Sequence, residues 1–414
     1  MTRRHHDSRT PPDRRDRNAD HRPAGPVRGD AGAAGSAPVL RRLDLPYAVI
    51  GAVIVAIVVL PAHLVLRVDI VFADRLRDLL LLIFFTTIGL SAKLGALRQG
   101  GKPLLILCAI TVLLLVLRNI AGTAVAIAWG AHPFYGLIAG SLSFVGGPGT
   151  ALAWAREGQA MGLSASPIVA IGAATMAALS GAMVSGPITG WIVRRHRLHA
   201  AANSEESVPF VIPHEDTPPP ASDKDGLERL LSTILVIAAA VFIGDTINAL
   251  ARGAGLLLPG FLCAMLAGVL ITNLTDVVGY RLDFAPIEKG GEVALHMFLV
   301  IALMGAQLAA VATILTPLVI NLMLQLAITT IVTYFILFRL LGRDYDAAVT
   351  VGGFLGFGIS SMPVAMATMD EVAKCYGPSA KAFLLITLAG SFFVDLANAF
   401  VAKAFLSLPL YAAP

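Results

Sequence analysis

From residue 46 onward, the chain alternates long apolar runs with short polar stretches. A run of about 20 apolar residues crosses the hydrocarbon core of a bilayer as one helix. The runs predicted to span are 46–66, 79–94, 104–129 and 168–193 in the first half, and 230–250, 256–271, 293–310, 318–341 and 383–406 in the second. The run at 79–94 is short but continuous. This pattern predicts an all-α polytopic membrane protein.

Two further apolar stretches contain too many helix breakers to form uninterrupted helices. Residues 139–153 read AGSLSFVGGPGTALA, and residues 351–365 read VGGFLGFGISSMPVA. Glycine and proline weaken or end a helix, and non-helical backbone at membrane depth needs protein or a water-filled cavity to satisfy its hydrogen bonds. Each stretch by itself is equally compatible with a kinked helix whose small residues admit a close neighbour.

The two broken stretches occupy corresponding positions in the two halves of the chain. An offset of 212 residues pairs Gly140 with Gly352 and Gly146 with Gly358. Interrupted segments at matching positions are the usual sequence indication of a secondary transporter's binding site. The chain is therefore predicted to form two inverted repeats of transmembrane helices, each with a glycine-rich re-entrant or broken helix.

Composition agrees with a membrane protein and sets two polar segments apart. Hydrophobic residues make up 56% of the chain and charged residues 14%. Residues 1–45 form an arginine-rich tail that is predicted to be disordered, and residues 194–228 form a polar linker between repeats at 46–193 and 229–414. The tail carries ten arginines and six aspartates, which account for the whole formal net charge of +4. The basic balance therefore gives no indication of nucleic-acid binding.

Basic residues gather on alternate connections between the predicted spans. The positive-inside rule assigns these connections to the cytoplasm, together with the tail and the linker. The residues so assigned are Lys93, Arg98, Lys102, Arg194, Arg195, Arg197, Arg281, Lys289, Arg339 and Arg343. The outer connections include the nearly uncharged stretches around His132 and Thr316, and the C-terminus. With run 230–250 as an added crossing, the first broken stretch enters from outside and the second from the cytoplasm, so their tips meet near mid-membrane.

Several motifs resemble those of the bacterial sodium/glutamate symporters. The most specific are GGPGT at 146–150, DYDAAV at 344–349, Phe-Gly at 357–358 followed by Pro363, and FFVDLANAF at 392–400. The resemblance covers residues 45–409, nearly the whole ordered chain. It implies a multi-pass protein of the bacterial cytoplasmic membrane that takes up glutamate with sodium. It also implies a homodimer with a moving transport domain.

The sequence departs from the family's pattern at both hairpin tips. Pro148 stands where the family usually has histidine, and Ser360, Ser361 and Met362 stand where it has Gly-Ala-Thr. Family members also carry one more N-terminal helix, which this chain is expected to lack. Because both tips are altered, symport of another organic acid, or cation antiport, is the alternative to glutamate uptake.

The broken stretches supply the groups that an acidic amino acid requires. Half-helix N-termini and backbone N–H groups bind carboxylates, and glycines let the backbone approach the ligand. Hydroxyl groups add hydrogen bonds, although each one is also compatible with a bond back to its own helix. The predicted substrate-binding residues are Ser141, Ser143, Gly146, Gly147, Gly149, Thr150, Gly356, Gly358, Ser360, Ser361 and Pro363.

One acidic residue, Asp395, lies inside the last predicted span, and Asn398 follows it on the same helix face. An acid at the membrane centre costs about 2.5–3.5 kcal/mol on insertion scales, which indicates a function. The equivalent place in the first repeat is near Ser185, so the carboxylate is not duplicated. Asp395 and Asn398 are predicted to bind the coupling sodium ion, with a structural ion pair as the alternative. Arg118, in the middle of another span, is compatible with pairing to an acid or to the substrate.

Other classes of protein find little support in the sequence. A membrane enzyme needs a catalytic cluster, and the chain has no HExxH motif and no paired carboxylates on one span. The cysteines Cys108, Cys263 and Cys375 are too widely spaced for a disulfide framework or a metal site. No cofactor and no metal other than sodium is expected. A channel also uses broken helices, but the inverted duplication and the lone acid favour alternating access.

Overall fold

The computed structural model describes residues 74–95, 100–200, 223–254, 258–279, 282–304 and 314–411. Within these ranges every regular element is a helix. Five of the helices are long and apolar enough to cross a membrane: 101–128, 166–196, 228–253, 260–278 and 315–340. The prediction of an all-α polytopic membrane protein is therefore confirmed. The predicted tail at 1–45, the run at 46–66 and most of the linker lie outside the described residues, and the inverted repeat stays a prediction.

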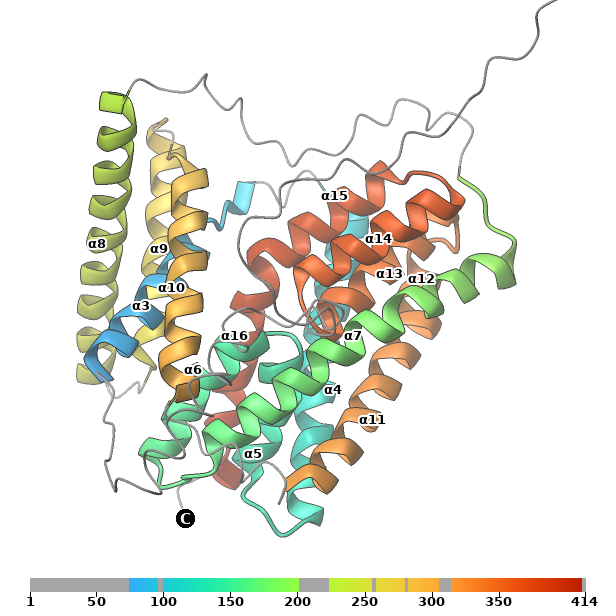
Figure 1. The fold of residues 1–414 in the computed structure, drawn as a ribbon, viewed down its shortest axis with the longest axis horizontal. Coiled ribbons are helices and arrows are strands. Elements are labelled where there is room, and N and C mark those ends of the chain that lie inside the picture. Colours follow the sequence, from blue (N-terminus) through green and yellow to red (C-terminus); the bar gives the residue numbers. More distant parts are fainter. Residues whose placement is uncertain are drawn as a thin grey trace, which may run out of the picture. The chain divides into compact units, whose positions relative to one another are not determined.

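One group of helices joins a single helix of the first half to three of the second. Its members are α3 (Asp74–Leu90), α8 (Asp223–Gly253), α9 (Gly260–Val278) and α10 (Phe284–Met304), which pack against one another (Figure 1). The close crossing of α3 and α9 depends on Gly268, where a Cβ atom would lie 2.7 Å from the backbone nitrogen of Leu90. Thr272 also donates a hydrogen bond of 2.6 Å to the Leu90 carbonyl.

The remaining helices pack together as a second group that contains both broken stretches (Figure 1). The first broken stretch lies in hairpin 1 (residues 133–160), and the second in hairpin 2 (residues 345–376). Hairpin 1 comprises α5 (Pro133–Leu137), η2 (Ile138–Leu142) and α6 (Gly147–Ala160), and hairpin 2 comprises α13 (Tyr345–Ile359) and α14 (Met362–Tyr376). The other members are α4 (Gly101–Ala128), α7 (Ser166–His196), α11 (Leu315–Ile331), η4 (Val332–Leu337), α12 (Phe338–Leu340), α15 (Ala380–Leu388), η5 (Ala389–Phe393), α16 (Val394–Leu406) and η6 (Pro409–Tyr411).

Local sequence explains where each hairpin starts and breaks. The His132 ring accepts a hydrogen bond from the Phe134 amide at the start of α5, and Asp344 caps α13 through the Ala347 amide at 2.7 Å. Hairpin 1 breaks just before Gly147, whose φ of +67° disfavours other residues. Hairpin 2 breaks at Ser361, which is fully extended before α14 begins. Both stretches are therefore broken helices, as the sequence predicts.

Contacts along α7 show that the two hairpins enter from opposite ends. At the N-terminal end of α7, Gly158 near the base of hairpin 1 packs against Ser166. At the C-terminal end, Arg194 donates a hydrogen bond of 3.0 Å to Tyr376 at the base of hairpin 2. Between these ends the helix meets the tip of hairpin 1 at Ala170 and then the tip of hairpin 2 at Ala178. The tips therefore approach each other from opposite directions along the middle of one helix.

Within the described residues, the predicted spans fall on helices, and most of their ends differ by a few residues. The largest difference is at α10, which begins at Phe284 although its apolar run begins at Val293. Glu288, Lys289 and Glu292 are exposed side chains in this first part of the helix. An apolar run alone does not reveal a helix that begins with polar residues in water.

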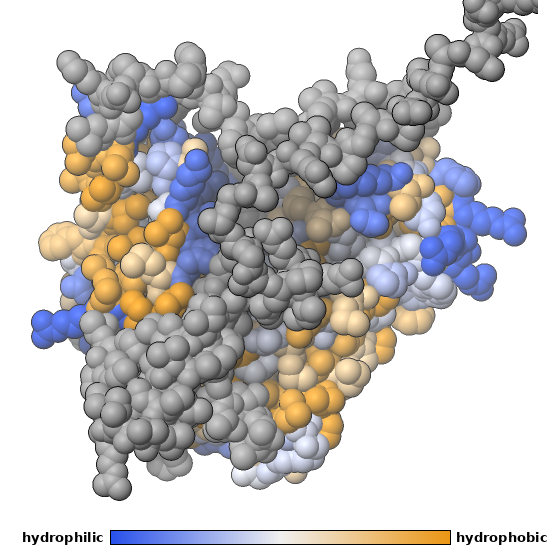
Figure 2. All heavy atoms as spheres, in the orientation of Figure 1, coloured by the Kyte–Doolittle hydropathy of each residue, from blue (hydrophilic) through white to orange (hydrophobic). Residues whose placement is uncertain are grey.

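The outer faces of α8 and α11 are apolar, as expected for helices that contact lipid. Leu235 and Phe242 on α8 are 70% and 74% exposed, and Met323 and Ile331 on α11 are also exposed. Figure 2 shows hydrophobic residues over much of the left-hand helices and hydrophilic residues at the upper right. Exposed apolar side chains of this kind agree with membrane insertion.

Candidate functional site

The tip of hairpin 1 is joined to two other helices by buried hydrogen bonds. The Ser141 hydroxyl donates to Asn398 Oδ1 on α16 at 2.6 Å, and the Asn398 amide donates back to the Ser141 carbonyl at 3.2 Å. The Ser141 backbone amide donates to Asn119 Oδ1 on α4 at 3.1 Å. All three side chains are fully buried. The structure thus brings the predicted residues Ser141 and Asn398 together, with Asn119 as a third member.

Arg118 lies beside this cluster and is fully buried. Its Nη2 atom donates a hydrogen bond to the Thr329 hydroxyl on α11. Its guanidinium carbon is 5.2 Å from the ring centroid of Phe144, near the tip of hairpin 1. A cation over an aromatic face at this distance is attracted by the ring. Nε and Nη1 have no hydrogen-bond partner in the described part of the chain.

Helix α11 and the adjoining η4 contribute a row of polar side chains that the predicted site residues did not include. Asn321, Gln325, Thr329 and Thr333 recur every fourth residue and are all buried. The Asn321 amide donates to the Ala139 carbonyl of hairpin 1 at 2.6 Å, and the Gln325 amide donates to the Arg118 carbonyl at 3.0 Å. The signal was present in the sequence, because polar residues four apart in an otherwise apolar span lie on one helix face.

The tip of hairpin 2 is held by tight packing rather than by strong hydrogen bonds. Ser360 is buried, its hydroxyl lies 3.5 Å from the Ala178 carbonyl, and Gly181 of α7 leaves no room for a side chain beside it. On the other side, Met362 packs directly against Gly390 in η5. A tip enclosed in this way moves only if these neighbours move or separate.

The two tips converge on the same short parts of two other helices. On α4, Leu114 faces Gly358 of hairpin 2, and Arg118 faces Gly140 of hairpin 1. These α4 positions are about 6 Å apart along the helix axis, at 1.5 Å per residue. On the last span, Gly390 meets hairpin 2 and Asn398 meets hairpin 1.

Asp395 lies between these two contacts on the last span, so it lies at the level of both tips. Its side chain is partly exposed, and it has no hydrogen bond or ion pair with any residue that the structure describes. Asn398, in contrast, uses both of its amide atoms on Ser141. The carboxylate is therefore free to bind a cation, whereas Asn398 must share its oxygen with a hydroxyl donor.

The second half-helix of each hairpin begins with an N-terminus that no side chain caps. Neither Gly146 before α6 nor Ser361 before α14 forms a side-chain capping hydrogen bond, and each helix has a proline in its first turn. The first backbone N–H groups of a helix have no partner within the helix, and the helix dipole makes this end positive. Both N-termini can therefore bind a carboxylate.

The other predicted substrate-binding residues lie in different environments. Ser143, Thr150, Gly356 and Gly358 are buried, whereas Gly146, Gly147 and Ser361 are partly exposed and Pro363 is exposed. Gly149 points away from the tips, because a Cβ atom there would lie 2.6 Å from Leu295 on α10. Gly149 thus packs hairpin 1 against the four-helix group.

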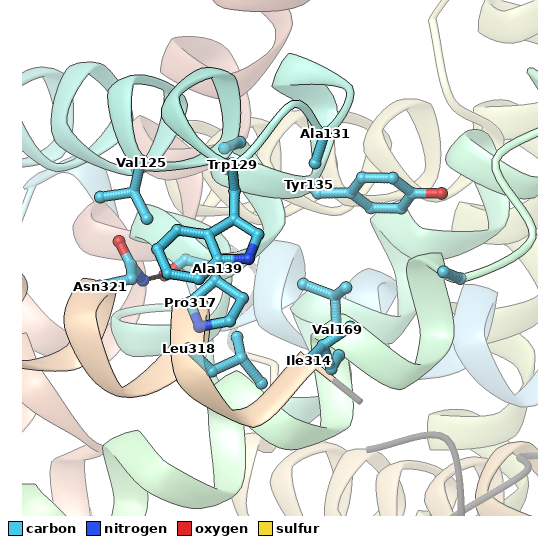
Figure 3. Close-up of a pocket in the computed structure, with 14 residues that line it drawn as sticks. Val125, Trp129, Ala131, Tyr135, Ala139, Val169, Ile314, Pro317, Leu318 and Asn321 are labelled. Atoms are coloured by element: carbon cyan, nitrogen blue, oxygen red, sulfur yellow. Dashed lines mark hydrogen bonds between the residues drawn. The ribbon is translucent and has the colours of Figure 1, made fainter. Parts of the chain in front are cut away.

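A cavity of about 170 Å³ lies beside hairpin 1, toward the end of the molecule where α4 ends and α11 begins (Figure 3). Its lining is mostly apolar and includes Trp129, Tyr135 and Leu318, with Asn321 as its amide side chain. The hydrogen bond of 3.2 Å from Gln325 to Asn321 links this lining to the buried polar row.

Two broken-helix hairpins that approach the same segments of α4 and the last span, one of them through a buried polar cluster, define a secondary transporter of the class that binds its substrate at broken helices. The family model for the sodium/glutamate symporter matches residues 33–378. The sodium/glutamate symporter of Escherichia coli (strain K12) is 33% identical over 385 residues, which cover 91% of this chain and 94% of that protein. The sodium/glutamate symporter of Haemophilus influenzae (strain Rd) is 35% identical over 367 residues, 88% and 90% of the two chains. The chain belongs to the sodium/glutamate symporter family.

Proposed function

We propose that this protein takes up glutamate, or a closely related acidic amino acid, together with sodium across the bacterial cytoplasmic membrane. Family membership supports the reaction. The observation that carries the proposal has two parts. Hairpin 1 at Gly140 and Ser141 and hairpin 2 at Gly358 and Met362 contact the same segments of α4 and the last span. The second half-helix of each hairpin, α6 or α14, begins with an uncapped N-terminus. These N-termini bind the substrate carboxylate, with Ser141, Ser143, Ser360 and Ser361 around them.

Asp395 binds the coupling sodium ion in this proposal. Sodium prefers oxygen ligands, and a carboxylate at the level of the hairpin breaks can combine with backbone carbonyls that the broken helices leave free. Among the described residues, no basic side chain forms an ion pair with Asp395 and so competes with sodium, which supports this role. Asn398 positions Ser141 through a hydrogen bond, and its Oδ1 atom can bind sodium while it still accepts the bond from the Ser141 hydroxyl.

We further propose that the base of hairpin 2 lies on the cytoplasmic side. Arg194 and Arg195 lie in the last turn of α7 and Arg197 follows it. His196 contacts Tyr334 near the end of the α11–α12 span, where Arg339 lies. The opposite end holds His132, the start of α11 and Tyr411, which is hydrogen-bonded to Thr123 at 2.5 Å. This asymmetry supports an orientation by the positive-inside rule. The family resemblance supports a homodimer.

Reconstituted protein provides the test. An inward sodium gradient in proteoliposomes should drive accumulation of labelled glutamate, and dissipating the gradient with a sodium ionophore should abolish it. The altered tips at Pro148 and Ser360 make another organic acid the second candidate, so the panel includes aspartate and dicarboxylates without an amino group. Accumulation of none of these compounds under a sodium gradient would refute the proposal. Cation exchange without uptake would indicate an antiporter.

A further inference from the structure

The guanidinium group of Arg118 is the buried group that the proposed site leaves unused. The side chain is fully buried in the middle of α4, and only one of its three nitrogen atoms has a hydrogen-bond partner within the described ranges. That partner is the neutral hydroxyl of Thr329. The guanidinium group forms no ion pair with a carboxylate among the residues that the structure describes.

Such an arrangement is unfavourable unless an anion completes it. A buried charge without a counter-charge is strongly destabilising, and each buried donor without an acceptor adds a further penalty. A neighbouring donor, Nδ2 of Asn119, also has no partner among the described residues, so unsatisfied N–H groups on two adjacent residues lie beside hairpin 1. Donors that lack acceptors indicate a missing acceptor, and a positive charge indicates that this acceptor is negative.

The place of Arg118 in the fold connects this acceptor to the substrate. The guanidinium group lies over Phe144, close to the break in hairpin 1, and the Arg118 carbonyl lies next to Gly140 in the same hairpin. The adjacent Asn119 holds the Ser141 amide. A substrate bound at the hairpin tips is therefore within the neighbourhood of Arg118, whereas Asp395 serves the cation on the last span.

We propose that Arg118 binds the second carboxylate of the substrate and so makes the transporter selective for dicarboxylic over monocarboxylic amino acids. This inference rests on the proposed function and assigns the specificity within its site. One carboxylate binds the half-helix N-termini at the tips. The other accepts two hydrogen bonds from one edge of the guanidinium group, from Nε or Nη1 together with the second N–H of Nη2, whose first N–H donates to Thr329. Arginine suits this role, because its planar fork pairs with a carboxylate through two parallel hydrogen bonds.

The test compares glutamate with glutamine, which has the same shape but lacks the second carboxylate. Sodium-driven uptake of labelled glutamate is measured in proteoliposomes, and unlabelled glutamine is added as competitor. Arg118→Gln should weaken the apparent affinity for glutamate by about tenfold or more, while the inhibition constant of glutamine changes little. Arg339→Gln removes an exposed arginine at the end of α12 and should keep the wild-type ratio.

The outcomes separate this inference from the proposed function. If the wild type shows no sodium-driven glutamate uptake, the proposed function fails whatever Arg118 does. If the wild type is active and Arg118→Gln keeps the wild-type ratio of glutamate to glutamine affinity, the assignment of Arg118 is overturned. If the ratio of glutamate to glutamine affinity is unchanged and uptake requires chloride, Arg118 binds an inorganic anion instead. That outcome also overturns the assignment of Arg118 to the substrate carboxylate.

A second variant keeps the test decisive if Arg118→Gln does not fold, as judged by size-exclusion chromatography. Arg118→Lys retains the charge but loses the fork. It should keep the preference for glutamate over glutamine while weakening glutamate affinity severalfold. A lysine variant with wild-type affinity for both compounds would refute binding through the guanidinium fork.

Discussion

Replacing Gly352 with alanine tests how closely hairpin 2 packs against α7. A Cβ atom at this position would lie 2.6 Å from Thr189 Oγ1, 2.9 Å from its Cγ2 and 3.2 Å from its Cβ. Ordinary contacts between carbon atoms are about 3.5–4.0 Å. Rotating Thr189 about χ1 gives little relief, because a β-branched residue replaces one branch by the other. The Thr189 hydroxyl also donates to the Ser185 carbonyl at 2.7 Å. The two helices must therefore separate.

The expected cost follows from this overlap. Overpacking a well-packed core costs about 1–3 kcal/mol, and replacing a glycine inside a helix by alanine returns about 0.5–1 kcal/mol. Gly352→Ala should therefore be destabilising on balance. A matched control on α7 is Gly190→Ala, where the nearest atoms belong to the flexible guanidinium end of Arg194, at 3.2 Å. Gly190→Ala therefore has the same gain in helix propensity, but its new Cβ atom overlaps little with neighbouring atoms.

The measurement is the temperature at which half of the detergent-solubilised protein loses its size-exclusion peak, together with sodium-driven uptake. Gly352→Ala should lower this temperature by a few degrees relative to Gly190→Ala. Combining it with Thr189→Ala removes both crowding atoms and should recover most of the loss, because the packed volume is then nearly conserved. Equal temperatures for Gly352→Ala and Gly190→Ala, or a double variant no better than Gly352→Ala alone, would refute the tight packing of α13 on α7.

Three further predictions concern the topology, the hairpin tip and the cation. In a variant that lacks Cys375, a cysteine that replaces Ala160 should react with an impermeant maleimide in intact cells. A cysteine that replaces His199 should not react. Labelling of both positions would contradict the assigned orientation. Pro148→His adds a backbone donor and a side-chain donor at the start of α6, so it should change substrate affinity or preference more than it changes the protein level. Unchanged uptake of every compound in the substrate panel would contradict a role of this tip in substrate recognition. Asp395→Asn deletes the charge while keeping the shape. Normal membrane insertion with loss of sodium-stimulated uptake is expected, whereas depleted protein would indicate a structural ion pair worth about 3–5 kcal/mol.

The sequence by itself determined the elements and the breaks between them. Apolar runs located the spans, because the thickness of the bilayer sets the length of a helix that crosses it. Glycines and prolines located both hairpin breaks for a local reason, since they act on the backbone at their own positions. The motifs around Gly146 and Asp395 were sufficient to indicate the family.

Only the tertiary structure decided which helices and side chains meet. Helix α3 belongs to the first half of the chain, yet it packs with α8, α9 and α10 of the second half. Gly149 faces Leu295 rather than the tips, while Ser141 faces Asn398, and the spacing of residues in hairpin 1 does not distinguish these directions. In a membrane, lipid-facing and protein-facing residues are both apolar, so hydrophobicity does not mark the inner face of a span. The environment of Arg118 likewise depends on Thr329 and Phe144, which come from segments far apart in the chain. Only their packing shows that its charge has no counter-charge among the residues that the structure describes.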